Sequence, residues 1–416
     1  MASKCRVLIL TQWFDPEPTF KGLVFARELV RLGFEVDVIT GFPNYPGGRL
    51  YPGYKMRWVQ KEVLEGVNVV RVPLYPSHDK GAKGRVLNYI SFAASSFLYG
   101  LLFARKFDVI YAYHPPLTVG VTAVLLKLLR RARVVYDIQD MWPDTLRATG
   151  MFSNERALRI VAAACDWIYK RVDHIVVLSP GFKRLLVERR VPDSKIEVIY
   201  NWCDEQSMSV REATPPPAFP VSGFRVLFAG NMGKAQALPA VIEAAEILAS
   251  EGIDASFVFL GGGVEVDNLK SLAAGKKLAN VTFLPPVPMS EVGAYLSSAD
   301  ALLVHLKKDP LFSITIPSKT QAYMSAGKPI IMGVDGDAAD LVLDAQCGQV
   351  AEPENARSLA EAVKALMLST KDQQHAMAQR GRSYYLERLS LATGTRAFAA
   401  IFARGSDGDR FSARVQ

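Results

Sequence analysis

Short runs of apolar, often β-branched residues alternate along most of the chain with segments in which apolar residues recur at helical spacing. The first run is 6–11. A loop follows, then an amphipathic segment at about 22–32, and then a second apolar run at 34–40. Continuous apolar runs of this length are typical of buried parallel strands, and the segments between them are typical of connecting helices. The opening therefore predicts a strand–helix–strand unit of the Rossmann-like type, in which ligands bind at the carboxyl ends of the strands.

The same alternation fails once, between Asp204 and Gly223, and then restarts. Prolines cluster in this interval, as is typical of a linker between domains. A chain of 416 residues is also too long for a single core. We therefore predict an α/β protein of two Rossmann-like domains that face each other across a cleft. The predicted parts are an N-terminal domain at 1–204, a linker at 205–223, a second domain at 224–385, and a final helix and tail at 386–416.

The segment 86–104 carries no charge and is nearly as long as a membrane-spanning helix. It contains Asn88 and several serines, and a run expected to be a strand begins at Asp108, soon after its end. A span at this place would divide the first domain, so we favour a buried or interfacial helix over a membrane span. Lysines and arginines flank the segment, and apolar contact beside cationic charge draws a helix to anionic lipid.

The composition describes a globular protein with a basic surface. Hydrophobic residues make up 50% of the chain, charged residues make up 22%, and the formal net charge is +8. A basic excess suits nucleotide diphosphates or acidic lipid headgroups. Because no nucleic-acid-binding signature is present, we expect no nucleic acid partner. The four cysteines show neither metal-ligand nor disulfide spacing, and the first residues lack the features of a signal peptide, so we expect a cytoplasmic protein.

The stretch 313–331 predicts a loop, a short helix and a buried strand. Pro317 suits the first turn of the helix, and Ser318 and Thr320 could satisfy the free N–H groups of that turn. Lys319 lies in the same turn, where the exposed N–H groups already favour an anion. It is therefore either a solvated lysine on an ordinary helix or a ligand for a bound diphosphate.

A second candidate is the loop GNMGKAQ at 230–236, between a predicted strand and a predicted helix. Its glycines allow the backbone to approach a ligand closely, and Lys234 adds positive charge. Together with Lys319 it suggests a diphosphate clamp. The glycines at 261–263 follow the next predicted strand and would leave room for a nucleoside.

Further candidates follow or precede the predicted elements of the first domain. Asp140 and Asp144 follow a strand, where a carboxylate can bind sugar hydroxyls or accept the proton of an acceptor hydroxyl. Asp140 is the better candidate, because Asp144 suits a helix cap. His114 is either a site residue or a structural histidine. Lys21, with Gly22, could face a phosphate at the start of a helix, although a solvated lysine is favoured. No GxGxxG motif is present, so a dinucleotide cofactor is not indicated.

Several segments together resemble the GT-B glycosyltransferases of family 4, over about Arg6 to Leu391. The nearest branch is that of the N-acetylfucosaminyltransferase-like enzymes of O-antigen, capsule and exopolysaccharide biosynthesis. The segments are IPSKTQAYMSAGKPI, GNMGKAQ, DMWPDTL, VVLSPGFKRLL and IEVIYNWCDE. The resemblance implies a retaining transfer from a nucleotide-activated sugar without a bound metal or other cofactor. It also implies an acceptor-binding N-terminal domain, a donor-binding C-terminal domain, and a last helix that crosses back to the first domain.

Carried over by position, the loop of Gly22 would approach the transferred sugar or the β-phosphate. Lys234 and Lys319 would neutralise the diphosphate leaving group, and Pro286 would border the base. The main contribution of the protein would be electrostatic stabilisation of the charge that develops on the departing phosphate, which would help to take the acceptor's proton. The implied site is Asp140, Lys234 and Lys319 as catalytic residues, with Lys21, Gly22, His114, Gly230, Asn231, Gly233, Gln236, Gly261, Pro286, Pro317, Ser318 and Thr320 as substrate-binding residues.

The sequence departs from the family pattern at several of these places. Ile314 and Ala322 stand where many members carry two glutamates, the second of which binds the ribose. Asn231 replaces a common arginine, Gln236 aligns best with the usual lysine, and Gln139 replaces a common histidine. These changes put the roles of individual residues in doubt more than the resemblance itself.

The sequence as a whole thus predicts a glycosyltransferase at the cytoplasmic face of the plasma membrane. We expect a UDP-sugar donor, of the N-acetylated hexosamine type, and a polyprenyl-diphosphate-linked saccharide acceptor. The alternatives are a UDP-N-acetylglucosamine 2-epimerase and a non-catalytic nucleotide-sugar-binding scaffold at the membrane.

Overall fold

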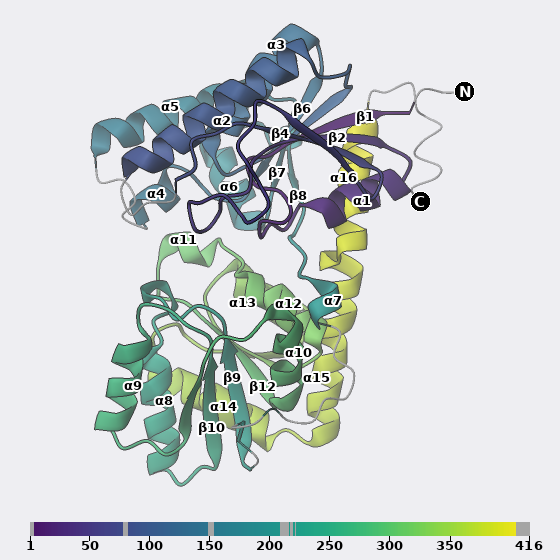
Figure 1. Cartoon of the computed structure of the whole chain (residues 1–416). Helices are drawn as coiled ribbons and strands as arrows, with labels where there is room; N and C mark the ends of the chain where they lie inside the picture. The colour runs from purple at the N-terminus through teal and green to yellow at the C-terminus, as the bar shows by residue number, and fades with distance from the viewer. Residues whose placement is uncertain are drawn as a thin grey trace. The chain divides into compact units, whose positions relative to one another are not determined.

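The structure is a computed structural model that describes residues 4–77, 82–148, 154–208, 216, 219–220 and 222–404. Within them the chain forms two compact units (Figure 1). The N-terminal unit holds the residues up to Tyr200 together with those from Gly394 onward, and the C-terminal unit runs from Asn201 to Thr393. The two predicted Rossmann-like domains are confirmed, and each is described separately below.

Most of the predicted linker at 205–223 lies outside the described residues. Its first part forms a short helix, α7 (Glu205–Met208). The Glu205 carboxylate accepts hydrogen bonds from the Tyr385 hydroxyl and the Leu391 N–H, both at 2.9 Å. These bonds tie the start of the predicted linker to the C-terminal unit.

The N-terminal unit is built on an eight-stranded sheet of order β3-β4-β2-β1-β5-β6-β7-β8, in which only β3 is antiparallel to its neighbour. The strand order reverses between β1 and β5, so the crevice expected for a ligand lies at their carboxyl ends. The strands are β1 (Arg6–Leu10), β2 (Glu35–Gly41), β3 (Gln60–Leu64), β4 (Val67–Val72), β5 (Val109–Tyr113), β6 (Arg133–Ile138), β7 (His174–Val177) and β8 (Ile196–Val198). The helices are α1 (Leu23–Arg31), α2 (Ala82–Leu102), α3 (Leu117–Arg130), α4 (Asp144–Ala148), α5 (Glu155–Arg171), α6 (Pro180–Glu188), the 3-10 turn Asp193–Lys195, and α16 (Leu391–Ala403).

The C-terminal unit has a six-stranded, fully parallel sheet of order β11-β10-β9-β12-β13-β14, which reverses between β9 and β12. Its strands are β9 (Phe224–Ala229), β10 (Ala255–Leu260), β11 (Val281–Leu284), β12 (Ala301–His305), β13 (Ile330–Gly333) and β14 (Gly348–Val350). Besides α7, its helices are α8 (Pro239–Ser250), α9 (Val266–Gly275), α10 (Met289–Ser298), α11 (Pro310–Ser313), α12 (Ser318–Ala326), α13 (Asp337–Asp344), α14 (Ala356–Leu368), α15 (Lys371–Tyr384), a 3-10 turn at Lys234–Gln236 and a π-helical turn at Tyr385–Leu389.

The last helix, α16, packs in the N-terminal unit, as the predicted return of the chain requires. The ring of Phe398 lies 5.3 Å from those of Phe25 and Tyr111 between centroids. The Arg133 guanidinium donates a hydrogen bond to the Phe402 carbonyl at 2.6 Å. An aromatic cluster thus joins α16 to α1 and β5.

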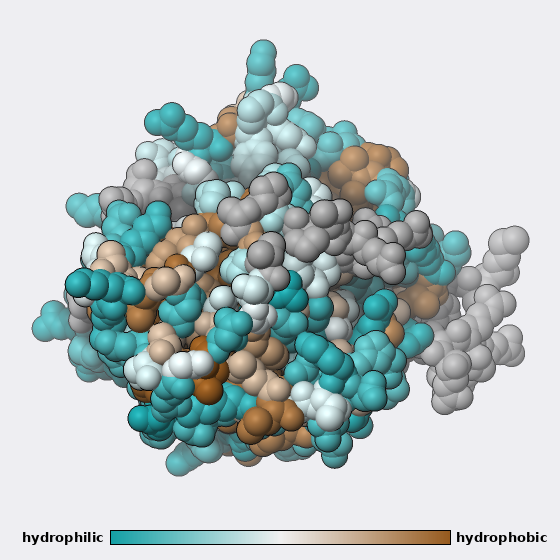
Figure 2. All heavy atoms as spheres, turned by 90° about the horizontal axis from the view of Figure 1, so that it is seen from below, coloured by the Kyte–Doolittle hydropathy of each residue, from teal (hydrophilic) through white to brown (hydrophobic). Residues whose placement is uncertain are grey.

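Helix α2 contains most of the predicted apolar segment 86–104, whose last two residues lie beyond the helix. Its inner side buries Asn88, Phe92 and Tyr99, while Leu87, Ile90 and Leu98 are exposed. In the part of the chain that the structure describes, no helix combines the length and apolar character needed to cross a membrane. On the face seen from below in Figure 2, hydrophilic residues cover most of the surface and hydrophobic ones form separate small patches.

Candidate functional site

Two glycine-containing loops meet at the carboxyl ends of β9 and β10. The N–H of Gly230 donates to the Leu260 carbonyl at 2.8 Å, and that of Met232 donates to Gly262 at 2.7 Å. Gly230 and Gly261 adopt φ values of +130° and +136°, and a Cβ on Gly261 would stand 2.2 Å from the Gly230 oxygen. Glycine is therefore needed at these positions for the two loops to pack against each other. This packing is a second reason for the glycines, besides the predicted approach of a ligand.

Lys319 reaches this double loop from the first turn of α12. Its ammonium lies 4.0 Å from the centroid of the Phe228 ring, and a Cβ on Gly230 would come within 2.7 Å of its Cε. Burial lowers the pKa of Lys319 to about 8, and no charged group among the described residues offsets this effect. Lys319 is therefore partly withdrawn from water and has no counter-ion among the described residues, which favours the prediction that it binds an anion.

The start of α12 differs from the prediction. Pro317 is the N-cap residue and no side chain caps the helix, so the predicted capping by Ser318 and Thr320 is wrong. Ser318 is exposed, whereas the Thr320 hydroxyl is buried and has no hydrogen-bond partner among the described residues. The first turn of α12 therefore keeps free donors beside Lys319.

The remaining loop residues form a 3-10 turn at Lys234–Gln236. The Gly233 N–H donates to the Gln236 side-chain oxygen at 2.9 Å, so Gln236 closes its own turn. Lys234 and Asn231 are exposed. Pro286 is also exposed, after β11, and a Cβ on Gly262 would lie 3.9 Å from its ring.

His305, which was not predicted as a site residue, holds this turn in place. Its Nδ1–H donates to the Gln236 carbonyl at 2.7 Å, and its Nε2 accepts from the Glu354 N–H at 3.1 Å. These two partners fix one neutral tautomer, and burial lowers the pKa of His305. The sequence placed His305 at the end of a strand, but nothing in it indicated two partners so far along the chain.

In the N-terminal unit, Lys21 is not placed as predicted. It neither faces solvent nor an open phosphate position, because it is fully buried and its ammonium donates to Asp137 at 2.5 Å. The Tyr111 hydroxyl donates to the same Asp137 oxygen at 2.5 Å, and Gln139 donates to the other at 2.6 Å. Burial lowers the pKa of Lys21 against the opposing effect of Asp137. Lys21 is therefore a structural cation, and the correction follows from a partner that sequence spacing did not reveal.

Gly22 is the N-cap residue of α1, and a different carboxylate caps this helix. Asp15 accepts a hydrogen bond from the Leu23 N–H at 2.6 Å, and a Cβ on Gly22 would lie 2.1 Å from the same Asp15 oxygen. The Asp15 carboxylate thus already occupies the position at which a phosphate was predicted. Because any Cβ at Gly22 would collide with this carboxylate, the cap requires glycine.

His114 and Asp140 follow the neighbouring strands β5 and β6. His114 is buried against Trp142, with centroids 5.1 Å apart, and its Nδ1 has no partner among the described residues. Burial lowers the pKa of His114 to about 3, so it is neutral near pH 7. Burial also raises the pKa of Asp140, which remains partly exposed. Asp140 is thus better placed than His114 to meet a ligand.

Comparison with known protein families identifies both units. Residues 23–202 match the family model described as a glycosyl transferase 4-like domain, and residues 210–384 match that of glycosyl transferases group 1. The two units thus match, in chain order, two domain families of glycosyltransferases, each over somewhat less than half of the chain. Among curated proteins, it is 29% identical over 233 residues to WbjE of Pseudomonas aeruginosa, described as a glycosyltransferase, across 55% of this chain and 58% of that protein. The match thus spans less than two thirds of that relative.

A second relative covers more of the glycosyltransferase. WcaI of Escherichia coli K12, named as a colanic acid biosynthesis glycosyl transferase, is 28% identical over 77% of this chain and 81% of its own. Among solved structures, sucrose-phosphate synthase from Thermosynechococcus elongatus aligns with a TM-score of 0.72 at 14% identity, over 96% of this chain and 99% of that one. WaaG, a glycosyltransferase involved in lipopolysaccharide biosynthesis, aligns with 0.64 at 16% identity, over 96% and 100%. These structures share the GT-B fold with this chain.

Proposed function

We propose that this glycosyltransferase moves a sugar, with retention and without a metal, from a nucleotide diphosphate donor to a polyprenyl-diphosphate-linked saccharide. The observation that carries the donor half is Lys319, a partly buried cation that has no counter-ion among the described residues. A buried charge is costly unless it is paired. A diphosphate would supply the missing charge, and the free N–H groups at the start of α12 would add hydrogen bonds to it.

In the proposed reaction, the bond between the anomeric carbon and the β-phosphate oxygen breaks as the acceptor oxygen bonds to the same face of that carbon. The departing phosphate takes the acceptor's proton. Lys319, assisted by the exposed Lys234, stabilises the negative charge that develops on the phosphate. Asp140 is proposed to orient the acceptor hydroxyl, since it is a partly exposed carboxylate at a strand end.

The proposed base is uracil, and the proposed sugar is an N-acetylated hexosamine. The choice of UDP is supported by HepE of Anabaena, solved in complex with UDP and glucose, which aligns over 96% of this chain and 99% of its own with a TM-score of 0.67 and 15% identity. The proposed role of Pro286 is to border the base beside the loop at 261–263. The family's ribose-binding glutamate is absent at Ala322, so ribose is proposed to bind through other groups.

Calorimetric titration with UDP, GDP and ADP tests the donor proposal. We expect UDP to bind, and Lys319→Met to weaken binding at least tenfold, which corresponds to about 1.4 kcal/mol. Lys270→Met, which changes an exposed lysine on α9, is the matched control and should bind UDP like the unchanged protein. If none of the nucleotides binds, the diphosphate role of Lys319 is wrong. If UDP binds but no sugar is transferred to lipid-linked saccharides, a scaffold explains the protein better.

The second partner proposed is the anionic inner face of the plasma membrane. Leu87, Ile90, Ala94, Leu98 and Leu102 are all exposed and follow one another at helical spacing on α2. Such a stripe beside the basic flanks of the helix suits the interface of an anionic bilayer. We expect sedimentation with anionic vesicles at low salt, and its loss in the Leu87→Glu, Ile90→Glu double variant. Equal sedimentation of both proteins would contradict this location.

A further inference from the structure

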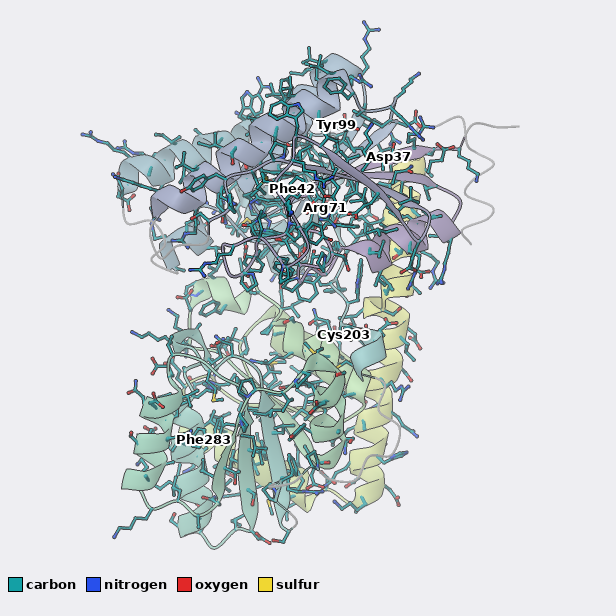
Figure 3. The ribbon with its side chains drawn as sticks, in the orientation of Figure 1. Asp37, Phe42, Arg71, Tyr99, Cys203 and Phe283 are labelled. Carbon is teal, nitrogen blue, oxygen red and sulfur yellow. The ribbon has the colours of Figure 1, made fainter. Side chains whose placement is uncertain are left out.

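An apolar hollow lies at the outer edge of the N-terminal sheet. It is a shallow, open hollow between the start of β3, the end of β4 and the second half of α2. Its lining includes Trp58, Val72, Pro73, Leu98, Tyr99 and Phe103. Tyr99 is labelled on α2 in Figure 3. The hollow is shallow and open to solvent, so it suits a stretch of chain that lies along it rather than an enclosed ligand.

The chemistry of the walls favours hydrocarbon. The Ser95 hydroxyl, which also lines the hollow, donates to the Pro73 carbonyl at 2.6 Å and is therefore already used. The other lining residues are aliphatic or aromatic. A ligand that depends on hydrogen bonds would gain little here, whereas an apolar chain would be removed from water.

Large apolar side chains at the hollow remain in water. Trp58 is 73% exposed, Phe103 is 63% exposed and Leu98 is 41% exposed. Contiguous exposed apolar residues of this size mark interaction sites, and tryptophan is enriched where one side of a site is apolar and the other is wet. Leu98 also belongs to the stripe on α2, so the hollow continues that surface.

The charge beside the hollow is positive. Lys55, Arg57 and Lys61 come from the segment that carries Trp58, and none of these three described residues forms an ion pair. The Lys61 ammonium lies 6.0 Å from the centroid of the Tyr99 ring. The acid of the same segment, Glu62, is paired with Arg71 at 2.7 Å and so does not neutralise them. Cations around an apolar hollow are complementary to a hydrocarbon chain that ends in a phosphate.

The hollow also shares an edge of the sheet with the proposed acceptor residues. It lies at the end of β4, and Asp140 follows β6, four strand spacings away in the order β4-β2-β1-β5-β6. Four spacings amount to about 19 Å, a separation that a diphosphate and a saccharide can occupy. We propose that the hollow binds the isoprenoid chain of the acceptor's carrier lipid next to its diphosphate, with Lys61 facing the phosphate. This inference rests on the proposed function, because it names a subsite for the proposed acceptor.

Tryptophan emission tests the inference with farnesyl diphosphate as the probe, used below its critical micelle concentration. We expect a saturable blue shift that is absent in Trp58→Phe, which assigns the signal to one of the 5 tryptophans. Inorganic diphosphate should give no shift. Leu98→Asp should weaken farnesyl diphosphate at least tenfold, and Lys61→Glu should weaken it several-fold. Ile160→Asp, at a residue 70% exposed on α5, is the matched control and should change nothing.

Two results would overturn the inference. One is a failure of farnesyl diphosphate to depend on the hollow. This would be seen as unchanged Trp58 emission, or as equal affinity of the unchanged protein and the Leu98→Asp variant for farnesyl diphosphate. The other is a response to vesicles of brominated phosphatidylglycerol without a response to farnesyl diphosphate, which would make this surface a bilayer contact. UDP titration of the same variants keeps the two proposals separate. If UDP binds but farnesyl diphosphate does not, only the proposed role of the hollow is wrong. If the unchanged protein does not bind UDP, the donor proposal is wrong.

Discussion

Each unit shields one lysine near the start of a helix from water, Lys21 fully and Lys319 partly, and the two environments differ. Lys21 in the N-terminal unit has Asp137 at 2.5 Å, with both side chains fully buried. Lys319 in the C-terminal unit lies over an aromatic ring, and in the described parts of the chain no charged group offsets its partial burial. A buried pair needs no ligand, whereas a buried lone cation is stable only at a cost that a bound anion would remove. The comparison teaches that burial and pairing together, and not position in a helix, separate a structural lysine from a candidate for ligand binding.

The outer surfaces of the units differ in a related way. Sixteen of the twenty-one large hydrophobic residues that are exposed in the described parts of the chain belong to the N-terminal unit. They include the stripe on α2 and the rim of the hollow. The apolar contacts proposed for lipid thus fall on one unit, and the anion contacts proposed for the nucleotide fall on the other.

Removing the partner of Lys21 should give the largest effect. Asp137→Ala is expected to lower the free energy of unfolding by about 3–5 kcal/mol, because it leaves a buried ammonium without a counter-ion. Urea denaturation followed by circular dichroism measures this loss. Asp166→Ala, at an exposed position on α5, is the control. A loss no greater than that of the control would show that the pair is not important for stability.

In the C-terminal unit, the neutral side chain of His305 should contribute to the free energy of unfolding through the turn that it holds. His305→Leu is expected to lower the free energy of unfolding by about 1–3 kcal/mol, since the Gln236 carbonyl and the Glu354 N–H lose their partner. Thermal and urea unfolding of His305→Leu and of His375→Leu, an exposed histidine on α15, give the comparison. Equal stability of the two variants would contradict the role of His305 in stabilising the loop.

The dependence of UDP affinity on pH should sharpen the role of Lys319. Its pKa is lowered to about 8, so its positive charge is present at pH 7 and is lost as the pH rises through 8. Above that pH, affinity should fall by up to about tenfold per pH unit. The same group should make the protein more stable as pH rises from about 8 towards 10.5, because the unfolded state then binds more protons. Calorimetry at pH 7, 8 and 9 on the protein and on Lys319→Met measures the first effect, and equal pH profiles would contradict it.

The smallest expected effect is that of Lys319→Met on the free energy of unfolding, and it contrasts most sharply with that of Asp137→Ala. Without nucleotide, Lys319→Met should leave the free energy of unfolding unchanged or raise it by about 1 kcal/mol, because it removes a buried charge that has no partner. Urea denaturation with and without UDP measures this difference. A marked loss of stability in the absence of UDP would mean that Lys319 has a structural role instead.

The fold was largely predictable from the sequence because continuous apolar runs determine buried parallel strands. The runs at 34–40 and 301–305 correspond closely to β2 and β12. The interval at 204–223 was less accessible to prediction. There the loss of periodicity concealed α7, whose Glu205 is bonded to residues far along the chain.

Candidate residues were predicted less well, because their roles depend on distant partners. Lys21 and Asp137 are 116 residues apart in sequence, so no local pattern could reveal that Lys21 is paired. The hydroxyls of Ser318 and Thr320 were expected to cap α12, but Pro317 takes the N-cap position and leaves Thr320 buried. Lys319 was identified because helix position and charge are local properties. Its burial was not.

The return of α16 to the N-terminal unit limits how the enzyme can be divided for protein engineering. A fragment that ends at Tyr200 would lack Phe398 and Phe402, and would leave Phe25 and Tyr111 without the rings that cover them. Chimeras that exchange the C-terminal unit between relatives therefore need two junctions, one after Tyr200 and one before Gly394. Recombination at a single crossover would separate the first half of the gene from the short 3′ segment that completes its product.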